Sequence, residues 1–355
     1  MTDTERRFGP DRLETFAALL LETAGARPAD AAAVAHHLVD ANLKGHDSHG
    51  VGLLPAYAHH IAKDLVNTAA EASTIKETTI LLQVDADGGW GGPAGLRLME
   101  QASAKAKEHG LAAATIGNAH HLGRIGAFAE RAAEAGLVSM HFVNVTDHAP
   151  LVAPYRGSDA RFGTNPVCIA FPPTPRRALF LLDMATSRIA LGKIRVAANK
   201  GKTLAPGCLI DEKGMPTTDP SGMAGFEVKG ALTPMSRHKG YGLAFACELL
   251  AGVLSGSGTI QPDNPRRGGI QNRMLSILID PDAFGDRSWM DTEIEAMADY
   301  ALASPPMDWD SPVLYPGDPE RALFGKRSRE GIPLDLKTLE QLNKTAEAVG
   351  LEERL

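Results

Sequence analysis

The sequence predicts an α+β protein with helices at both ends of the chain and a mixed or antiparallel sheet between them. Three observations carry this prediction: helical periodicity over the first sixty residues, several strand-like runs in the middle, and an amphipathic pattern near the end. The strand-like runs rarely alternate cleanly with helices, which disfavours a doubly wound parallel sheet.

Helical periodicity is clearest at the start of the chain. Large apolar residues recur over residues 13–20, and Pro28 separates this helix from a second one, which Asp30 is expected to cap. The second helix is expected to end near Gly45. A polar, glycine-rich turn over residues 45–52 follows it.

The middle of the chain combines β-favouring runs with turns. A helix over residues 96–110 is expected to end at Gly110, residues 192–240 are expected to be rich in loops, and residues 242–256 are expected to form a buried helix. The expected strands cover residues 78–84, 111–118, 137–145, 162–172, 178–187 and 274–284.

A final amphipathic helix is expected between Asp335, which can cap it, and Gly350. With the helices of the N-terminal region, it suggests a discontinuous organisation. Residues 1–77 and 325–355 would form a mainly helical region, and residues 78–324 would form a region built on the sheet.

The composition is that of a soluble globular protein. The 355 residues include 36 Lys and Arg against 43 Asp and Glu, a net charge of −7, which argues against a nucleic-acid partner. No apolar stretch is long enough to span a membrane, and the first residues do not resemble a signal peptide. Three separated cysteines exclude a zinc ribbon or disulfide framework and favour a cytoplasmic location.

Residues 89–94, GWGGPA, match a dinucleotide-binding pattern between a strand and a helix. Pro93 removes a backbone N–H that a phosphate would need, and the next strand ends at Asn118 and His120 without a carboxylate for a ribose. An ordinary glycine-rich turn is therefore favoured.

Histidines in polar, glycine-rich loops are candidates for proton transfer, because their unperturbed pKa lies near neutrality. His49 lies in the 45–52 turn beside Ser48, and His121 precedes a short helix. The alternative is a solvated surface histidine. A hydrolase that uses Ser48 is disfavoured because neighbouring side chains usually diverge and the GxSxG motif is missing.

Two further charged residues are candidates for the site. Asp183 ends an apolar run and is a candidate for fixing a histidine tautomer, or for capping the end of a strand. Arg124 is a candidate for binding a substrate carboxylate or a cofactor phosphate, or is a surface residue. The histidines form no HExxH motif, so no metal site is expected.

These motifs together resemble the malate/L-lactate dehydrogenase family of non-Rossmann oxidoreductases. The family also contains ureidoglycolate dehydrogenases and cyclic imino-acid reductases. The resemblance runs in family order from about residue 10 to residue 350. It is carried by GHDSHGVGLLPAY (45–57), NAHHLGRIGAFAE (118–130), FGTNPVCIAFP (162–172), LLDMATS (181–187), ALGKIRVAANKG (190–201), PGCLIDEKGMPTTDP (206–220), HKGYGLAFACELLAGVLSG (238–256) and LYPGDPE (314–320).

The resemblance implies a malate/L-lactate dehydrogenase-like fold and interconversion of 2-oxo and 2-hydroxy carboxylic acids, including aromatic ones. It implies NAD as cofactor, with NADP possible through Arg195 or Lys200, and a homodimer. The helical region would then serve substrate and dimer contacts, and the sheet region would bind the cofactor. A cyclic imino-acid reductase and a catalytically silent nicotinamide-binding protein are the alternatives.

The family motifs also transfer roles to single residues. The catalytic residues would be Ser48, His49, His121 and Asp183. The cofactor-binding residues would be His49, Gly123, Arg124, Ile125, Leu181, Leu182, Asp183, Met184, Ala185, His238, Asn272, Pro316, Gly317 and Asp318.

The sequence departs from the family pattern near the first motif. Leu53 occupies a position where many members have arginine, and Lys44 replaces another common arginine. If that arginine holds the substrate carboxylate, the task passes here to Arg124 or a lysine. The neutral Leu53 would also favour an apolar substrate side chain.

Overall fold

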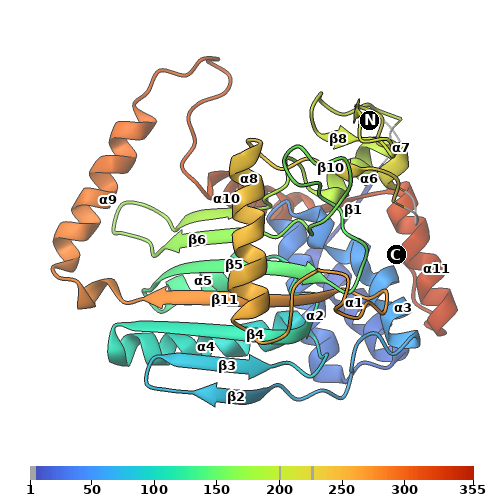
Figure 1. Cartoon of the computed structure of the whole chain (residues 1–355), viewed down its shortest axis with the longest axis horizontal. Coiled ribbons are helices and arrows are strands. Elements are labelled where there is room, and N and C mark those ends of the chain that lie inside the picture. The colour runs from blue at the N-terminus through green and yellow to red at the C-terminus, as the bar shows by residue number, and fades with distance from the viewer. Residues whose placement is uncertain (1–4, 200, 225–227) are drawn as a thin grey trace.

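The computed structural model describes residues 5–199, 201–224 and 228–355. Its centre is a seven-stranded sheet, shown in Figure 1, in which β3 and β4 are parallel and every other neighbouring pair is antiparallel. The prediction of a mixed sheet is confirmed. In spatial order the strands are β2 (Ser73–Glu77), β3 (Leu81–Asp85), β4 (Leu111–His120), β11 (Gln271–Ile279), β5 (Val138–Thr146), β6 (Val167–Phe171) and β7 (Phe180–Met184).

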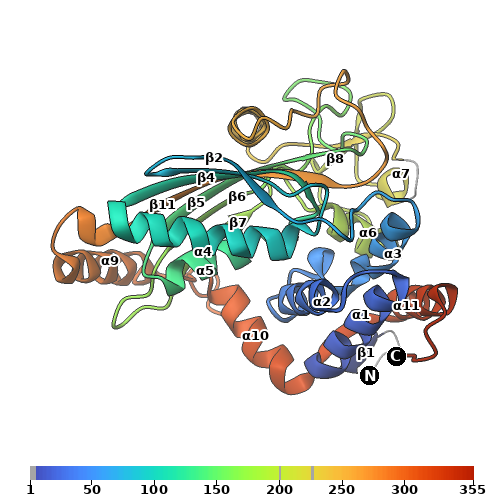
Figure 2. The same ribbon diagram turned by 90° about the horizontal axis from the view of Figure 1, so that it is seen from below.

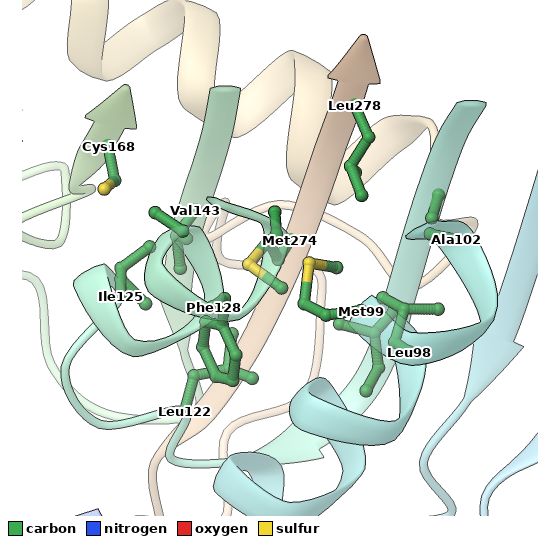
Figure 3. Close-up of a cluster of buried hydrophobic side chains, with 14 of the residues drawn as sticks. Leu98, Met99, Ala102, Leu122, Ile125, Phe128, Val143, Cys168, Met274 and Leu278 are labelled. Atoms are coloured by element: carbon green, nitrogen blue, oxygen red, sulfur yellow. The ribbon is translucent and has the colours of Figure 1, made fainter. Parts of the chain in front are cut away.

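Helices cover both faces of the sheet. Figure 2 shows α4 (Gly91–His109) and α5 (Gly126–Glu134) on one face, and α8 (His238–Cys247) lies on the other. Figure 3 shows the core under α4 and α5, where Phe128 and Leu98 are almost fully buried. Burying such a side chain stabilises the fold by roughly 1.5–3 kcal/mol.

A second core lies in a helical layer to one side of the sheet. Strand β1 (Glu5–Phe8) pairs with β12 (Ile332–Asp335), so the two ends of the chain meet there. Apolar residues from both ends share this core, which is separate from the sheet core. The helices of this layer are α1 (Pro10–Ala24), α2 (Pro28–Leu43), α3 (Leu54–Ala62), α10 (Asp318–Glu330) and α11 (Leu336–Val349).

The predicted ends of the last helix are correct. The Thr338 amide donates a hydrogen bond to the Asp335 carboxylate at 2.9 Å, and Gly350 ends α11 with a positive φ of 85°. Both ends of the helix thereby acquire partners for backbone groups that the helix itself leaves unpaired. The exact division of the chain into two regions remains a prediction.

Some expectations about helices are wrong. Asp30 does not cap the second helix, which begins at Pro28; its carboxylate pairs with Arg27 at 2.7 Å. The helix expected to be buried begins at His238 and changes to π-helical geometry over Glu248–Val253. Only one of its faces contacts the sheet, so the other exposes Phe245, Leu249, Val253 and Leu254.

The segment expected to be mostly loop also contains regular structure. Its short elements enclose a small core around Leu209 and Leu232, and glycines and prolines keep each element short. They are α6 (Leu191–Asn199), β8 (Leu209–Ile210), β9 (Pro216–Thr217), α7 (Ser221–Ala224) and β10 (Ala231–Leu232).

The sequence prediction also missed α9 (Arg287–Leu302). This helix projects beyond the end of the sheet (Figure 1), and only Ala298 is buried along it. A helix with so little buried surface has no strong apolar periodicity. No helix in the described ranges is long and apolar enough to cross a membrane.

Candidate active site

The 45–52 turn places Ser48 and His49 in contact. Two short 3₁₀ turns, η1 (Asp47–His49) and η2 (Val51–Leu53), follow α2. The His49 amide donates to the His46 carbonyl at 2.8 Å, and the Ser48 hydroxyl lies 3.0 Å from His49 Nδ1. The expectation that the two side chains diverge is therefore wrong, because the tight turn brings adjacent side chains together.

His121 follows β4, and its loop is held by Asn272. The Leu122 amide donates to Asn272 Oδ1 at 2.8 Å, and Asn272 Nδ2 donates to the Asn144 carbonyl at 3.0 Å. Asn272 is buried, so its polar atoms join this loop to β5 and β11. A contact between Asn272 and a cofactor remains a prediction.

The two candidate histidines lie together. The rings of His49 and His121 stack with centroids 5.5 Å apart and planes 16° apart. The Nδ1 atom of His49 faces the Ser48 hydroxyl, and the Nδ1 atom of His121 lies 2.7 Å from the Tyr57 hydroxyl. Neither Nε2 atom has a hydrogen-bond partner in the described part of the chain, so each is available to a ligand.

Tyr57 is a site residue that the sequence prediction missed. It lies on α3, which begins directly after the turn that carries His49. The only signal in the sequence was its position in the 45–57 stretch that carries the family resemblance. Its tyrosine hydroxyl is the polar end of a side chain that is otherwise packed in the helical core.

A further layer of aromatic rings lies behind this pair. His60 Nδ1 is 2.8 Å from His120 Nε2, and the His120 ring packs edge-on against Tyr57 and Trp90 at 5.0 and 5.2 Å. All four side chains are buried. The sequence prediction also missed this layer, which excludes water from behind His121.

The glycine-rich turn before α4 serves packing. A side chain at Gly91 would overlap the backbone carbonyl of His120, and one at Gly92 would contact His37. The start of α4 is therefore covered by the end of β4, which leaves no room for a phosphate there. This agrees with the favoured prediction of an ordinary turn.

Burial changes the proton affinity of the two site histidines. Desolvation, followed by the charges of His46, His37 and Arg124, lowers the pKa of His49 to about 4. Desolvation and neighbouring histidines hold the pKa of His121 well below its ordinary value. Both rings are neutral at pH 7 in the free chain, so either can accept a proton at Nε2.

Arg124 forms internal ion pairs through Nη2, while its buried Nε and Nη1 have no hydrogen-bond partner in the described residues. Its side chain is 1% exposed, lies 3.0 Å from Asp40 and also pairs with Glu130. Lys44 pairs with the same two carboxylates at 2.7 Å each. Two cations and two anions thus balance one another. A substrate-binding role for Arg124 remains a prediction.

Asp183 lies at the end of β7 and supports the start of α5. Its Oδ2 accepts a hydrogen bond from the Gly126 amide at 2.8 Å, and burial raises its pKa. No histidine in the described residues bonds to this carboxylate. A role in fixing a histidine tautomer remains a prediction. The charges of His46 and Arg124 partly offset the rise in the pKa of Asp183.

Two of the predicted cofactor-binding stretches lie side by side. The Leu181 amide donates to the Pro316 carbonyl at 3.3 Å, and Gly317, at a φ of 96°, leads into α10 from Asp318. The side chains of Leu181 and Ile125 are buried in the sheet core, so neither side chain is available to a ligand. Leu182, Met184 and Ala185 are half-buried along the end of β7.

The remaining predicted residues are more scattered. Gly123 has a φ of 74° and packs on His37, which leaves no room for a side chain. His238 is exposed at the start of α8, with its ring 6.0 Å from Tyr155, and no described contact joins it to His49 or His121. The Arg195 side chain and Lys200 lie outside the described residues.

Comparison with known proteins decides the family. The family model described as malate/L-lactate dehydrogenase matches residues 8–343. The chain belongs to the malate/L-lactate dehydrogenase family. It is 41% identical to hydroxycarboxylate dehydrogenase B of Escherichia coli strain K12 over 353 residues, covering 99% of this chain and 96% of that protein.

Two further members of the family support this assignment. An L-lactate dehydrogenase of Cupriavidus necator is 43% identical over 83% of this chain and 84% of its own length. The structure of malate dehydrogenase from Pyrococcus horikoshii superposes with a TM-score of 0.86 at 31% identity, covering 99% and 98% of the two chains. The predicted malate/L-lactate dehydrogenase-like fold is therefore confirmed.

Within the described ranges of this family member, no group of three or more His, Cys, Asp or Glu side chains is arranged to hold a metal ion. The polar groups of the site are instead the stacked imidazoles and their hydroxyl partners. Such groups can transfer a proton at Nε2 while Nδ1 is held in place.

Proposed function

We propose that this chain is a nicotinamide-dependent oxidoreductase that interconverts 2-hydroxy and 2-oxo carboxylic acids. The observation that carries the proposal is the stacked pair of His49 and His121, each with a free Nε2. The relatives named as hydroxycarboxylate and L-lactate dehydrogenases support the same substrate class.

The residues around β7 and α10 fit a nicotinamide nucleotide. The stretches at Leu181 and Pro316 adjoin, and buried Glu320 Oε2 has no hydrogen-bond partner in the described residues. A ribose hydroxyl can donate to such an oxygen. When bound, the nucleotide supplies the hydride acceptor or donor at the nicotinamide C4. We propose NAD, and NADP remains an alternative.

The protein's contribution is to orient the substrate and to move one proton. During oxidation, His49 or His121 accepts the hydroxyl proton of the 2-hydroxy acid at Nε2, for which its lowered pKa makes the neutral form available. Ser48 and Tyr57 hold the rings through Nδ1. The proposal leaves open which of the two histidines accepts the proton.

In the direction of reduction the same histidine must carry a proton. The carboxylate of a bound substrate would raise the histidine pKa, because a nearby negative charge favours the imidazolium form. Substrate binding would thus bring with it the proton that the developing alkoxide needs. Asp183 would act at a distance, by supporting the loop before α5.

We also propose a homodimer and a cytoplasmic location. The outer face of α8 and the following π-helical segment exposes Phe245, Leu249 and Val253, each about half accessible. A contiguous apolar stripe of this kind is typical of a protein–protein interface. Three free, buried cysteines are compatible with a reducing compartment.

The decisive experiment follows nicotinamide absorbance with the purified protein. NADH and NADPH are each tested against phenylpyruvate, oxaloacetate, pyruvate and a cyclic imino acid. Turnover of the open-chain acids supports the proposal. Turnover of the imine alone would identify an imino-acid reductase. Nucleotide binding without turnover of any of these would favour a silent nicotinamide-binding protein.

A further inference from the structure

Helix α10 packs along the outside of the turn that carries His49. Three side chains on one face of this helix contact three consecutive residues of the turn: Glu320 lies 3.4 Å from His46, Leu323 packs on Gly45, and Arg327 pairs with Asp47. They lie at positions i, i+3 and i+7, which share one side of a helix.

The pair between Arg327 and Asp47 is the most specific of these contacts. Arg327 Nη1 lies 2.6 Å from Asp47 Oδ1 and Nη2 lies 3.0 Å from Oδ2, so both carboxylate oxygens are held. Arg327 Nη1 also donates to the Asn42 carbonyl at the end of α2. The Arg327 side chain is 11% exposed and the Asp47 side chain 47% exposed, so the arginine is largely enclosed while the carboxylate remains open to solvent.

Asn42 joins the two ends of the same turn. Its Nδ2 donates to Asp47 Oδ1 at 2.7 Å, and its Oδ1 accepts from the Val51 amide at 2.8 Å. Asn42 is buried, and a side chain at Gly50 would overlap it. Ser48 and His49 therefore lie in a short loop between two held residues. Arg327 and Asn42 hold Asp47 at its start, and Asn42 also holds Val51 at its end.

We propose that Arg327 is a positioning residue for His49, acting through Asp47 and Asn42. The inference rests on the role of His49 in the proposed function. Arg327 touches neither histidine of the site, so its effect would be geometric. Without the bidentate contact, the Asp47 carboxylate would keep, among the described residues, the Asn42 side-chain amide alone, and the turn would be free to shift relative to His121.

The test compares Arg327→Met and Arg327→Lys with a matched control, Arg329→Met. Arg329 is an exposed arginine in the same last turn of α10 and has no ion-pair partner in the described residues. We expect Arg327→Met to lower kcat roughly 10- to 100-fold, since a misplacement of about 1 Å can have that effect. The affinity of Arg327→Met for the nucleotide should be unchanged. Arg327→Lys should recover part of the lost kcat, and Arg329→Met should have the kcat of the original chain.

A second readout needs no turnover. Nitrogen-15 NMR of the histidine rings follows the titration of His49 in the free chain, whose pKa the structure places at about 4. In Arg327→Met we expect that pKa to rise toward 6.5 as the ring gains water, while His141, buried elsewhere in the sheet, keeps its own. If Arg327→Met does not fold, Asp47→Asn removes the charge of the pair at constant size.

The two readouts separate this inference from the proposed function. A chain without activity toward any tested substrate would contradict the proposed function, and the NMR titration would still report whether Arg327 holds His49. A wild-type kcat together with an unchanged His49 titration in Arg327→Met would overturn the inference. A loss of thermal stability alone, with both readouts unchanged, would show that the pair only fastens α10 to α2.

Discussion

The ring of His49 stacks on the ring of His121, with centroids 5.5 Å apart. The two residues come from different layers, one from the turn after α2 and the other from the end of a sheet strand. Burial is the main reason why both pKa values are lowered, and the charge of His49 lowers the pKa of His121 further. Both rings of the stacked pair are therefore neutral near pH 7.

Replacing the histidine that transfers the proton should slow the reaction strongly. We expect His49→Ala or His121→Ala, whichever removes that group, to lower kcat roughly 10²- to 10⁴-fold. His36→Ala is the control, because His36 is exposed and its ion-pair partner within the described residues is Glu14. Steady-state kinetics give kcat for the three variants. A wild-type kcat in both His49→Ala and His121→Ala would refute the proposed mechanism.

Removing the Tyr57 hydroxyl should have a smaller effect. Tyr57→Phe keeps the ring in the core but loses the 2.7 Å contact with His121, a hydrogen bond worth about 1 kcal/mol, or roughly fivefold in rate. Tyr155→Phe removes a hydroxyl that has no described hydrogen bond and serves as control. Equal kcat values in the two variants would show that Tyr57 does not orient His121.

The pH dependence of oxidation should reflect the lowered pKa of the base. The pKa of His49 is about 4 in the free chain, below its ordinary value, so its neutral form prevails at all pH values above that. We expect kcat/KM for the 2-hydroxy acid to stay flat on the acid side down to about pH 5 and to fall as pH drops through 4. A fall of kcat/KM centred near pH 6.5 would mean that the base is a solvated histidine.

Leu53 should influence which substrate side chain is accepted. It is half-buried at the end of the turn that carries His49 and packs against the helical core. In Leu53→Arg we expect the preference to move from phenylpyruvate toward oxaloacetate, because a cation favours a second carboxylate. The ratio of the two kcat/KM values measures this, with Leu53→Ile as control. If Leu53→Arg has the same ratio as the original chain, Leu53 does not determine which substrate side chain is accepted.

The exposed stripe on α8 should hold the proposed dimer together. We expect the double variant Phe245→Asp, Leu249→Asp to be monomeric in light scattering, because two charges would have to be buried in an apolar contact. Ile75→Asp alters a similarly exposed residue on the edge strand β2 and should leave the dimer intact. A dimer that survives the double variant would place the interface elsewhere.

Much of the fold could be predicted because local signals agree with the final packing. Leu13 and Phe16 repeat at helical spacing and are buried in α1, and Asp335 and Gly350 mark the ends of α11. The elements that escaped prediction lack such signals. In α9, only Ala298 is buried, so its apolar residues do not line up along one face of the helix.

The candidate site was predictable only in part. The loop positions of His49 and His121 are visible in the sequence, but their stacking depends on how the helical layer meets the sheet. Tyr57 lies on a helix among apolar neighbours, so nothing local distinguishes its hydroxyl. Arg124 looked like a free cation, because its partners Asp40 and Glu130 come from two other elements.

The pairing of β1 with β12 has a consequence for how the protein is made. Phe8 and Phe16 leave the ribosome early, yet the residues that cover them, such as Ile332 and Leu342, are among the last to be synthesised. The sheet core, which needs no residue beyond Leu278, can form first. The first helices must therefore wait with exposed apolar surface, and it is at this stage of synthesis that we expect the nascent chain to depend most on chaperones.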